Sequence, residues 1–202
     1  MYALKLLLAL VMLLAAGLVP VLSQDKKEPA AGTEMDAWAK AHAPNANHKL
    51  LEKLAGNWMA DVTFVFNPKE KPELNKMAVK REMVMGGRFL YESYDLWQGS
   101  MPHEGRGYIG YNNSKKTFQM IHIESMNTAL EVTDGTWDEK TQTLSFPSGP
   151  KEMEWGGNKV KFTMTMSFTI ESEDKHTFSM KTKYEQMPDE IEEVKIVYTR
   201  RK

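Results

Sequence analysis

The amino-acid sequence predicts an all-β protein: an up-and-down antiparallel β-barrel of about ten strands, preceded by two short helices. The spacing of apolar residues changes from about 3.6 to 2 after Gly56 and then keeps the period of 2. The connections are short and rich in turn-forming residues, so consecutive strands are antiparallel neighbours. Because closure buries one apolar face of every strand and removes exposed edges, a barrel is favoured over two stacked sheets.

Two short helical stretches, on either side of Pro44, precede the strands. Apolar residues recur at helical spacing in both: Met35, Trp38 and Ala39 in the first, and Leu50, Leu51 and Leu54 in the second. Asn47 is the expected N-cap of the second helix, and Gly56 is the residue expected just past its end.

The clearest strand is Val160–Ile170, in which apolar and polar residues alternate without exception. Trp58–Phe66 repeats this design. The remaining strands are expected at Met77–Met85, Phe89–Trp97, Gly105–Tyr111, Thr117–Glu124, Ala129–Trp137, Thr143–Phe146, Lys175–Tyr184 and Glu192–Arg200.

The composition narrows the class of protein. The chain has 202 residues, 26 Lys and Arg against 27 Asp and Glu, 15 methionines and no cysteine. Such a chain can bury a sizeable core without disulfides, and its balanced charge predicts no nucleic-acid partner.

The N-terminus has the three-part pattern of a secretory signal peptide. Lys5 precedes an unbroken apolar run from Leu6 to Val21, and Val21-Leu22-Ser23 offers a cleavage site before Gln24. The run has 16 residues, fewer than the roughly 20 that a spanning helix needs. We therefore expect a signal peptide at 1–23, a flexible spacer at 24–33 and one domain at 34–202. The protein would be exported, periplasmic or secreted, with no stable membrane anchor after cleavage.

Two groups of residues carry a family resemblance. Gly56-Asn57-Trp58 at the start of the first strand and Tyr198-Thr199-Arg200 at the end of the last resemble the lipocalin and fatty-acid-binding (calycin) arrangement. That resemblance implies that Trp58 plugs one barrel end and that Arg200 packs across it, as a guanidinium over an indole face.

A longer series resembles the bacterial family DUF1579 over almost the whole mature chain. The series consists of Trp38, Pro44, His48, Leu51, Gly56-x-Trp58, Gly86-Gly87-Arg88-Phe89-Leu90, Gly105-x-Gly107, Gly110-Tyr111, Ser125-Met126 and Tyr198-x-Arg200. The chain departs from that family at Asn112, where Asp is usual after Gly-Tyr, so a role for that acid is not carried over. The family has no established activity, and the resemblance therefore implies a fold rather than a reaction.

Several polar residues lie on strand faces that should point into the barrel. His122 and Glu124 share a face with Phe118 and Met120. They could form a structural hydrogen-bonded pair, anchor a ligand in a cavity, or act together in acid/base catalysis. His176 shares an inward face with Phe178. Because an inward histidine can be a haem ligand, haem binding, as in the nitrobindins, is an alternative.

Arg81 interrupts the apolar side of its strand. It would pair with a buried carboxylate, Glu124 being a candidate, or with the carboxylate of a fatty-acid-like ligand; a strand-end position facing water is the alternative. Arg88 follows Gly86-Gly87, where a turn reverses the chain. His48 is expected to cap or pack in the helical lead-in, and His103 to lie in a solvated turn.

The methionine pairs Met83-x-Met85 and Met164-x-Met166 place thioethers two residues apart on a strand face. Cu(I) accepts such ligands, so copper stays an alternative, but both pairs continue an apolar stripe and are interpreted as core or cavity lining. No resident cofactor is otherwise expected, and no nucleophile motif is present.

The function expected from the sequence is binding of a small apolar or amphipathic ligand inside the barrel. The candidate apolar lining is Phe64, Met164, Met166, Phe168 and Phe178, and the candidate polar anchors are Arg81, His122, Glu124, His176 and Tyr184. The alternative is a non-catalytic structural or protein-interaction module whose barrel is filled by its own side chains. A hydrolase-type enzyme is disfavoured, and the sequence does not indicate the oligomeric state.

Overall fold

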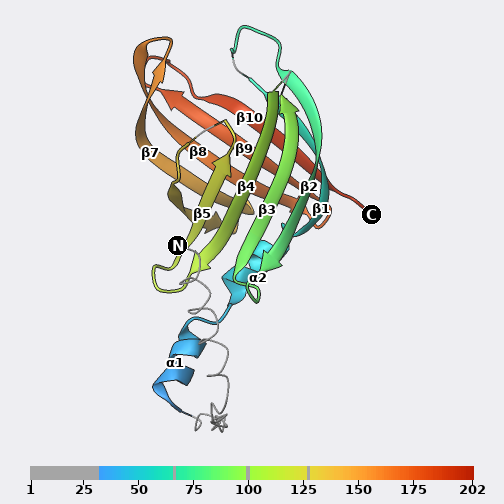
Figure 1. The fold of residues 1–202 in the computed structure, drawn as a ribbon, viewed down its shortest axis with the longest axis vertical. Helices are drawn as coiled ribbons and strands as arrows, with labels where there is room; N and C mark the ends of the chain where they lie inside the picture. The colour runs from blue at the N-terminus through green and yellow to red at the C-terminus, as the bar shows by residue number, and fades with distance from the viewer. Residues whose placement is uncertain (1–31, 66, 99–100, 127) are drawn as a thin grey trace, which may run out of the picture. The chain divides into compact units, whose positions relative to one another are not determined.

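The computed structural model describes residues 32–202 except 66, 99, 100 and 127. In the described residues the elements are α1 Glu34–Ala41, α2 Ala46–Glu52, β1 Gly56–Phe64, β2 Glu73–Val84, β3 Phe89–Gln98, β4 Met101–Asn112, β5 Thr117–Glu124, β6 Val132–Asp138, β7 Thr143–Trp155, β8 Asn158–Ser172, β9 Lys175–Tyr184 and β10 Ile191–Arg200 (Figure 1). The predicted signal peptide at 1–23 and most of the predicted spacer at 24–33 lie outside these residues. None of the described helices is long and apolar enough to cross a membrane.

The chain divides into two units, one ending at Trp38 and the other spanning Ala39–Lys202. The described part of the first unit includes the start of α1. There the Asp36 carboxylate accepts hydrogen bonds from the backbone N–H groups of Gly32 and Thr33, both at 3.1 Å, which satisfies donors that a helix start leaves free.

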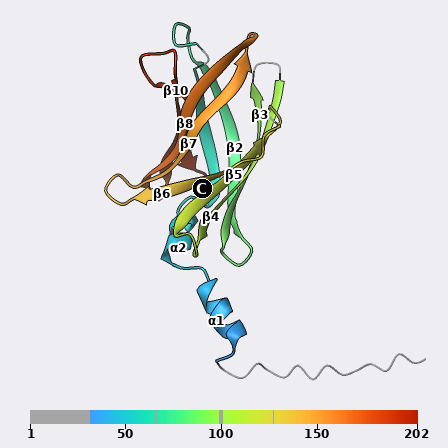
Figure 2. The same cartoon turned by 90° about the vertical axis from the view of Figure 1, so that its left-hand side faces the viewer.

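The second unit is a closed antiparallel barrel in which each strand pairs with its neighbours in sequence. The first strand also pairs with the last, with Trp58 opposite Arg200 and Phe64 opposite Val194 (Figures 1 and 2). This confirms the predicted up-and-down barrel and its number of strands.

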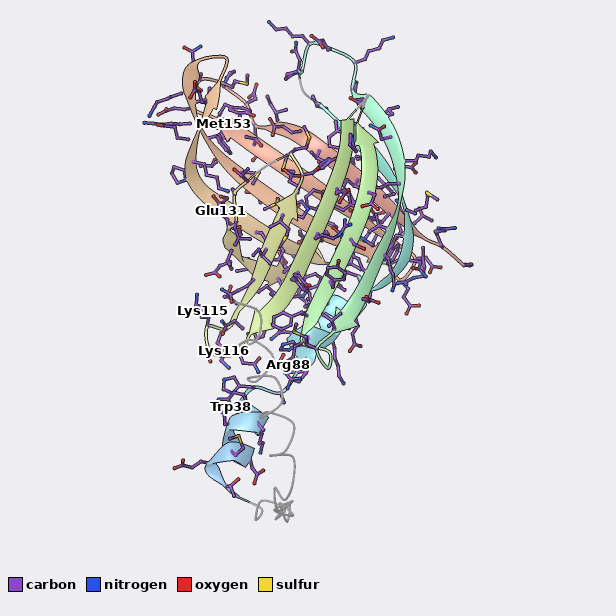
Figure 3. The ribbon with its side chains drawn as sticks, in the orientation of Figure 1. Trp38, Arg88, Lys115, Lys116, Glu131 and Met153 are labelled. Atoms are coloured by element: carbon purple, nitrogen blue, oxygen red, sulfur yellow. The ribbon has the colours of Figure 1, made fainter. Side chains whose placement is uncertain are left out.

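The barrel has two different ends. The α2 end contains α2 and the β2–β3, β4–β5, β6–β7 and β8–β9 hairpins, and the far end contains the other hairpins. Figure 3 labels Arg88, Lys115 and Lys116 at the α2 end and Met153 at the far end.

The α2 end is filled by protein side chains. Leu51 in α2 and Leu54 just after it are almost fully buried and belong to one core cluster with residues of five strands: Leu90, Ile109, Phe118, Met120, Leu144, Phe146 and Phe168. Because the amphipathic α2 segment covers this end, its leucines complete the core there.

The cap of α2 corrects one prediction. The N-cap is Asn45 and not Asn47: the Asn45 side chain accepts from the Asn47 backbone N–H at 2.9 Å, and His48 Nδ1 accepts from the Asn45 backbone N–H at 3.0 Å. The two side chains form a reciprocal capping box. The predicted capping role of His48 is confirmed.

The junction of the first and last strands has the expected contact. Gly56 has φ +134°, and a Cβ at this position would lie 2.3 Å from Arg200 Nη1. The Arg200 guanidinium lies 4.2 Å from the Trp58 ring centroid, and the fully buried indole donates to the Leu54 carbonyl at 3.0 Å. Glycine is therefore required for the arginine to reach the indole.

The β2–β3 turn corrects a second prediction. Gly86 and Gly87 have φ +67° and +79°, as expected for a tight reversal, and Arg88 Nη1 donates to the Met85 carbonyl at 3.2 Å. Met85 lies in this turn and is 68% exposed. It therefore does not share a strand face with Met83, because the strand ends at Val84.

Strand β7 is longer than predicted. The sequence around Pro147 and Pro150 is typical of a loop, yet β7 continues through it to Trp155. The described ladder between β6 and β7 ends at Ser145, so both prolines lie where β7 pairs with β8 alone. An edge strand tolerates proline because one side needs no N–H donor.

Candidate functional site

A buried ionic cluster lies inside the barrel. Arg81, only 2% exposed, donates from Nε to the Glu92 carboxylate and from Nη1 to His176 Nε2. Its guanidinium carbon lies 4.3 Å from the Tyr198 ring centroid and 5.2 Å from that of Phe168. The arginine is therefore paired and stacked within the protein.

The charges of this cluster are set by burial and by the ion pair. Burial, together with the positive charges of Arg81 and Arg200, lowers the pKa of His176 to about 2, so its imidazole is neutral. Burial alone would lower the pKa of Arg81, but Glu92 and Tyr198 together outweigh it and the pKa is raised. Because His176 accepts at Nε2, its proton is on Nδ1. Neither His176 Nδ1 nor Arg81 Nη2 has a hydrogen-bond partner among the described residues.

The position of Arg81 decides two of the alternatives left by the sequence, while a ligand carboxylate as a partner stays a hypothesis. It does not face water, and its carboxylate partner is Glu92 rather than Glu124. Glu92 lies directly opposite Arg81 in the β2–β3 ladder, and side chains in such a pair are the closest neighbours across a sheet.

A second polar cluster lies nearer the far end, on β3, β4 and β5. The Tyr94 hydroxyl is 3.2 Å from His122 Nε2, and His103 Nε2 is 2.9 Å from the Glu124 carboxylate. The Tyr94 ring stacks on His122 and meets His103 edge-on. Burial, with the charges of Glu124 and Glu92, raises the pKa of Tyr94, so the phenol is neutral.

The predicted hydrogen-bonded pair of His122 and Glu124 is not formed. Both side chains share a strand face, as expected, but His122 contacts Tyr94 and Glu124 contacts His103. Same-face neighbours on one strand lie about 7 Å apart, farther than a cross-strand pair. His103 is not in a solvated turn: it is 8% exposed and lies on β4.

A third polar group lies on β9 and β10. Thr182 Oγ1 donates to the Glu193 carboxylate at 2.6 Å, and the Tyr184 hydroxyl donates to the other carboxylate oxygen. Burial and this carboxylate raise the pKa of Tyr184. Tyr184 was a predicted anchor, whereas Glu193 was missed because a register shift between Glu192 and Val194 interrupts the alternation there.

The predicted apolar lining divides into two sets. Phe64 and Phe168 are buried in the core clusters, and Phe178 packs against both clusters. Met164 and Met166 lie on the same face of β8 as Phe168 but stay partly exposed. Met166 and Phe178 also pack against a core cluster, so Met164 is the residue of this set that a ligand can contact without repacking the core.

The residues considered for metal or haem have protein neighbours. Among the described residues no group of three or more His, Asp or Glu could hold a metal ion. The His176 ring lies between Trp58, at 4.2 Å, and Tyr198, at 4.5 Å between centroids. The expectation of no resident cofactor stays a prediction, with haem and copper as the alternatives.

Two of three comparisons relate the chain to known proteins. The search of the curated proteins found no match. The crystal structure of Rv2717c from M. tuberculosis is similar, with a TM-score of 0.54 and 13% identity over 79% of this chain and all of that one. A likeness at this identity shows the fold alone. The family described as a protein of unknown function, DUF1579, matches residues 43–200, and the chain therefore belongs to the DUF1579 family.

Proposed function

We propose that the barrel binds a small amphipathic molecule in the half remote from α2. The observation that carries this proposal is the exposure of inward-facing apolar side chains. Phe162, Met164, Met166 and Met180 continue the strand faces of Phe168, yet all four stay partly exposed. Apolar surface that a fold leaves open inside a barrel is typical of a ligand cavity.

The opposite side of the ring supplies polar groups. In the closed strand order β8 and β9 lie across the barrel from β3 and β4. The inward side chains of Phe162, Met164, Met166 and Met180, here called the methionine wall, therefore face the second polar cluster, which consists of Tyr94, His103, His122 and Glu124. His103 Nδ1 is buried without a hydrogen-bond partner among the described residues. A ligand chain on the methionines would place its polar group near these donors and acceptors.

A fluorescence titration with 11-(dansylamino)undecanoic acid tests this proposal. Met164→Trp would fill the inward wall, and Thr163→Trp, its outward-facing exposed neighbour on β8, is the matched control. We expect Met164→Trp to weaken binding about tenfold and Thr163→Trp to leave it unchanged. Equal binding by both variants, or no binding by the unaltered protein, would contradict the proposal.

A protein-interaction module is the second candidate. The filled α2 end favours it, as do exposed apolar side chains at the far end: Leu74 is 75%, Leu130 71% and Val132 62% exposed. A protein that binds no probe but loses a partner on Leu130→Ser substitution would fit this function instead.

We also propose export, on the strength of the Met1–Ser23 pattern. Intact-mass measurement of the protein purified from its own host tests it. A mass beginning at or near Gln24 is expected, and retention of Met1–Ser23 would contradict it.

A further inference from the structure

The ladder between β2 and β3 is much shorter than the strands themselves. In the described residues the two strands pair only from Lys80 opposite Ser93 to Val84 opposite Phe89. Both strands continue well beyond this point, and each keeps its other neighbour: β2 pairs with β1 up to Glu73, and β3 pairs with β4 up to Gln98. The barrel wall therefore forks between β2 and β3, and we call this fork the seam.

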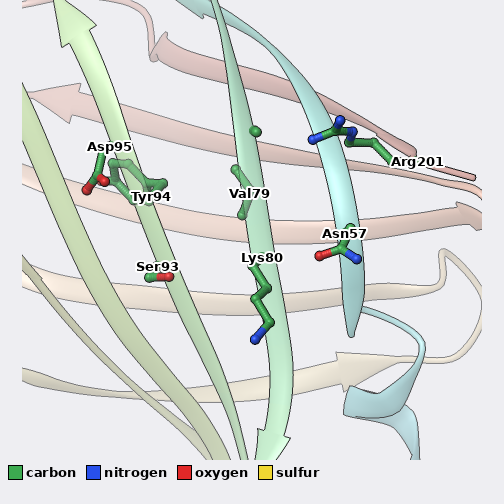
Figure 4. Close-up of a pocket in the computed structure, with 8 residues that line it drawn as sticks. Asn57, Val79, Lys80, Ser93, Tyr94, Asp95 and Arg201 are labelled. Atoms are coloured by element: carbon green, nitrogen blue, oxygen red, sulfur yellow. The ribbon is translucent and has the colours of Figure 1, made fainter.

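A cavity of about 460 Å³ lies at the seam (Figure 4). It is lined by Asn57, Ala78, Val79, Lys80, Ser93, Tyr94, Asp95 and Arg201. Most of these side chains lie on the outer face of the wall, where the small side chain of Ala78 leaves room. A volume of this size accommodates a small ligand or one end of a longer one.

Two of the lining residues belong to the inner face of the barrel. Val79 and Tyr94 share strand faces with the buried Met77 and Leu96. Tyr94 also contacts His122 at 3.2 Å in the interior polar cluster. Tyr94 thus borders both the outer cavity and the interior polar cluster, and a chain entering at the seam would displace the packed Val79 and Tyr94 side chains to reach the interior.

The outer margin of the cavity carries two cations. The Arg201 backbone N–H donates to the Asn57 carbonyl at 2.9 Å, which fixes the residue beside β1. Lys80 pairs with Glu82 at 2.8 Å, but both side chains are about half exposed or more, and such pairs exchange readily. The one acid in the lining, Asp95, already pairs with Arg106 at 3.1 Å.

We propose that the seam is the entry and head-group site for a single-chain anionic amphiphile. The carboxylate or other anionic head would bind Lys80 and Arg201 together with the Asn57 amide and the Ser93 hydroxyl. The apolar chain would pass Val79 and Tyr94 toward the methionine wall. This inference rests on the proposed function, since it names the class of ligand and its route.

Calorimetric titration with dodecanoate and with dodecan-1-ol tests the head-group site. The variant is Lys80→Gln with Arg201→Gln, and the matched control is Lys76→Gln with Lys195→Gln, which removes the same charge from exposed positions on β2 and β10. We expect the first pair to weaken dodecanoate binding about tenfold and to leave dodecan-1-ol binding within about twofold. The control pair should change neither.

Stopped-flow measurement with the dansyl probe tests the route. Ala78→Trp fills the outer cavity without touching the interior, so it should slow association about tenfold. Lys76→Trp, also outward-facing on β2, should leave the rate unchanged.

The outcomes separate the two proposals. If both seam variants bind like the unaltered protein while Met164→Trp loses binding, the seam inference is wrong and the proposed function stands. If the Lys80 and Arg201 variant weakens acid and alcohol equally, the head-group assignment is wrong. If the unaltered protein binds no probe, both proposals are wrong.

Discussion

At the scale of single residues, the interior polar cluster around Tyr94 depends on a glycine on the neighbouring strand, because glycine has no side chain. Gly105 on β4 lies opposite Tyr94 on β3. A Cβ at Gly105 would lie 2.2 Å from Tyr94 Cζ, so the ring covers the glycine backbone. Glycine at this position therefore permits the orientation in which Tyr94 meets His122.

We predict that Gly105→Ala displaces the Tyr94 ring. The free energy of unfolding should fall by about 1–3 kcal/mol, because a new methyl group is forced into an occupied position. Urea denaturation measures this. Gly149→Ala is the control, since nothing lies within 4 Å of the added carbon.

In a Tyr94→Val background, Gly105→Ala should lower the free energy of unfolding clearly less, because the ring that clashes with the new methyl group is gone. A full cost in that background would show that the strain arises elsewhere.

The sequence predicted the strand face on which a residue lies better than it predicted which side chain that residue contacts. The period of 2 correctly placed Arg81, His122, Glu124 and His176 on inward faces, because alternation is a local property of a strand. Their partners depend on the register of the neighbouring strand. No single-strand pattern therefore indicated that Glu92 would pair with Arg81.

At the scale of elements, α2 shows how a short helix is held. It has seven residues, too few for stability on its own. Burial of His48 and Leu51, together with the Asn45 cap, fixes it on the barrel end. The end of the barrel is thus closed by a helix that needs both its cap and its packing.

We predict that Asn45→Ala lowers the free energy of unfolding by about 1 kcal/mol, because one backbone donor of α2 loses its acceptor. Asn47→Ala, at the position the sequence favoured as the cap, should have a much smaller effect. Thermal and urea unfolding of the two variants measure the difference. A larger effect at Asn47 would contradict the assigned cap.

The elements themselves were largely predictable. Thr117–Glu124 and Lys175–Tyr184 match β5 and β9, since each alternates cleanly between turn sequences. The prediction for β7 stopped at Phe146 because prolines usually end strands. Their tolerance follows from the short ladder between β6 and β7, which depends on a different segment.

At the scale of the whole molecule, a chain without cysteine is closed by pairing its first strand with its last. His176 lies inside this closed barrel, 1% exposed and neutral. Folding therefore keeps a histidine unprotonated that the unfolded chain would protonate near its ordinary pKa of 6.5. Stability conferred by this arrangement is lost as the pH falls below that value, because only the unfolded state gains the proton.

We predict that His176→Gln reduces the pH dependence of unfolding. Between about pH 6.5 and pH 5 the unaltered protein should lose about 1 kcal/mol more per pH unit than the variant. Urea denaturation across this range measures both slopes. His42→Gln, at an exposed position, should keep the slope of the unaltered protein, and an unchanged slope in His176→Gln would contradict the assignment.

The sequence by itself determined the class of fold, the approximate number of strands and the inward face of those that alternate cleanly, because these follow from periodicity and turn chemistry within short segments. It also pointed to the contact between Trp58 and Arg200, through a family resemblance. Only the tertiary structure decided which polar groups meet and where the wall forks. Those features depend on how far each ladder extends, and that length is set jointly by strands distant in sequence.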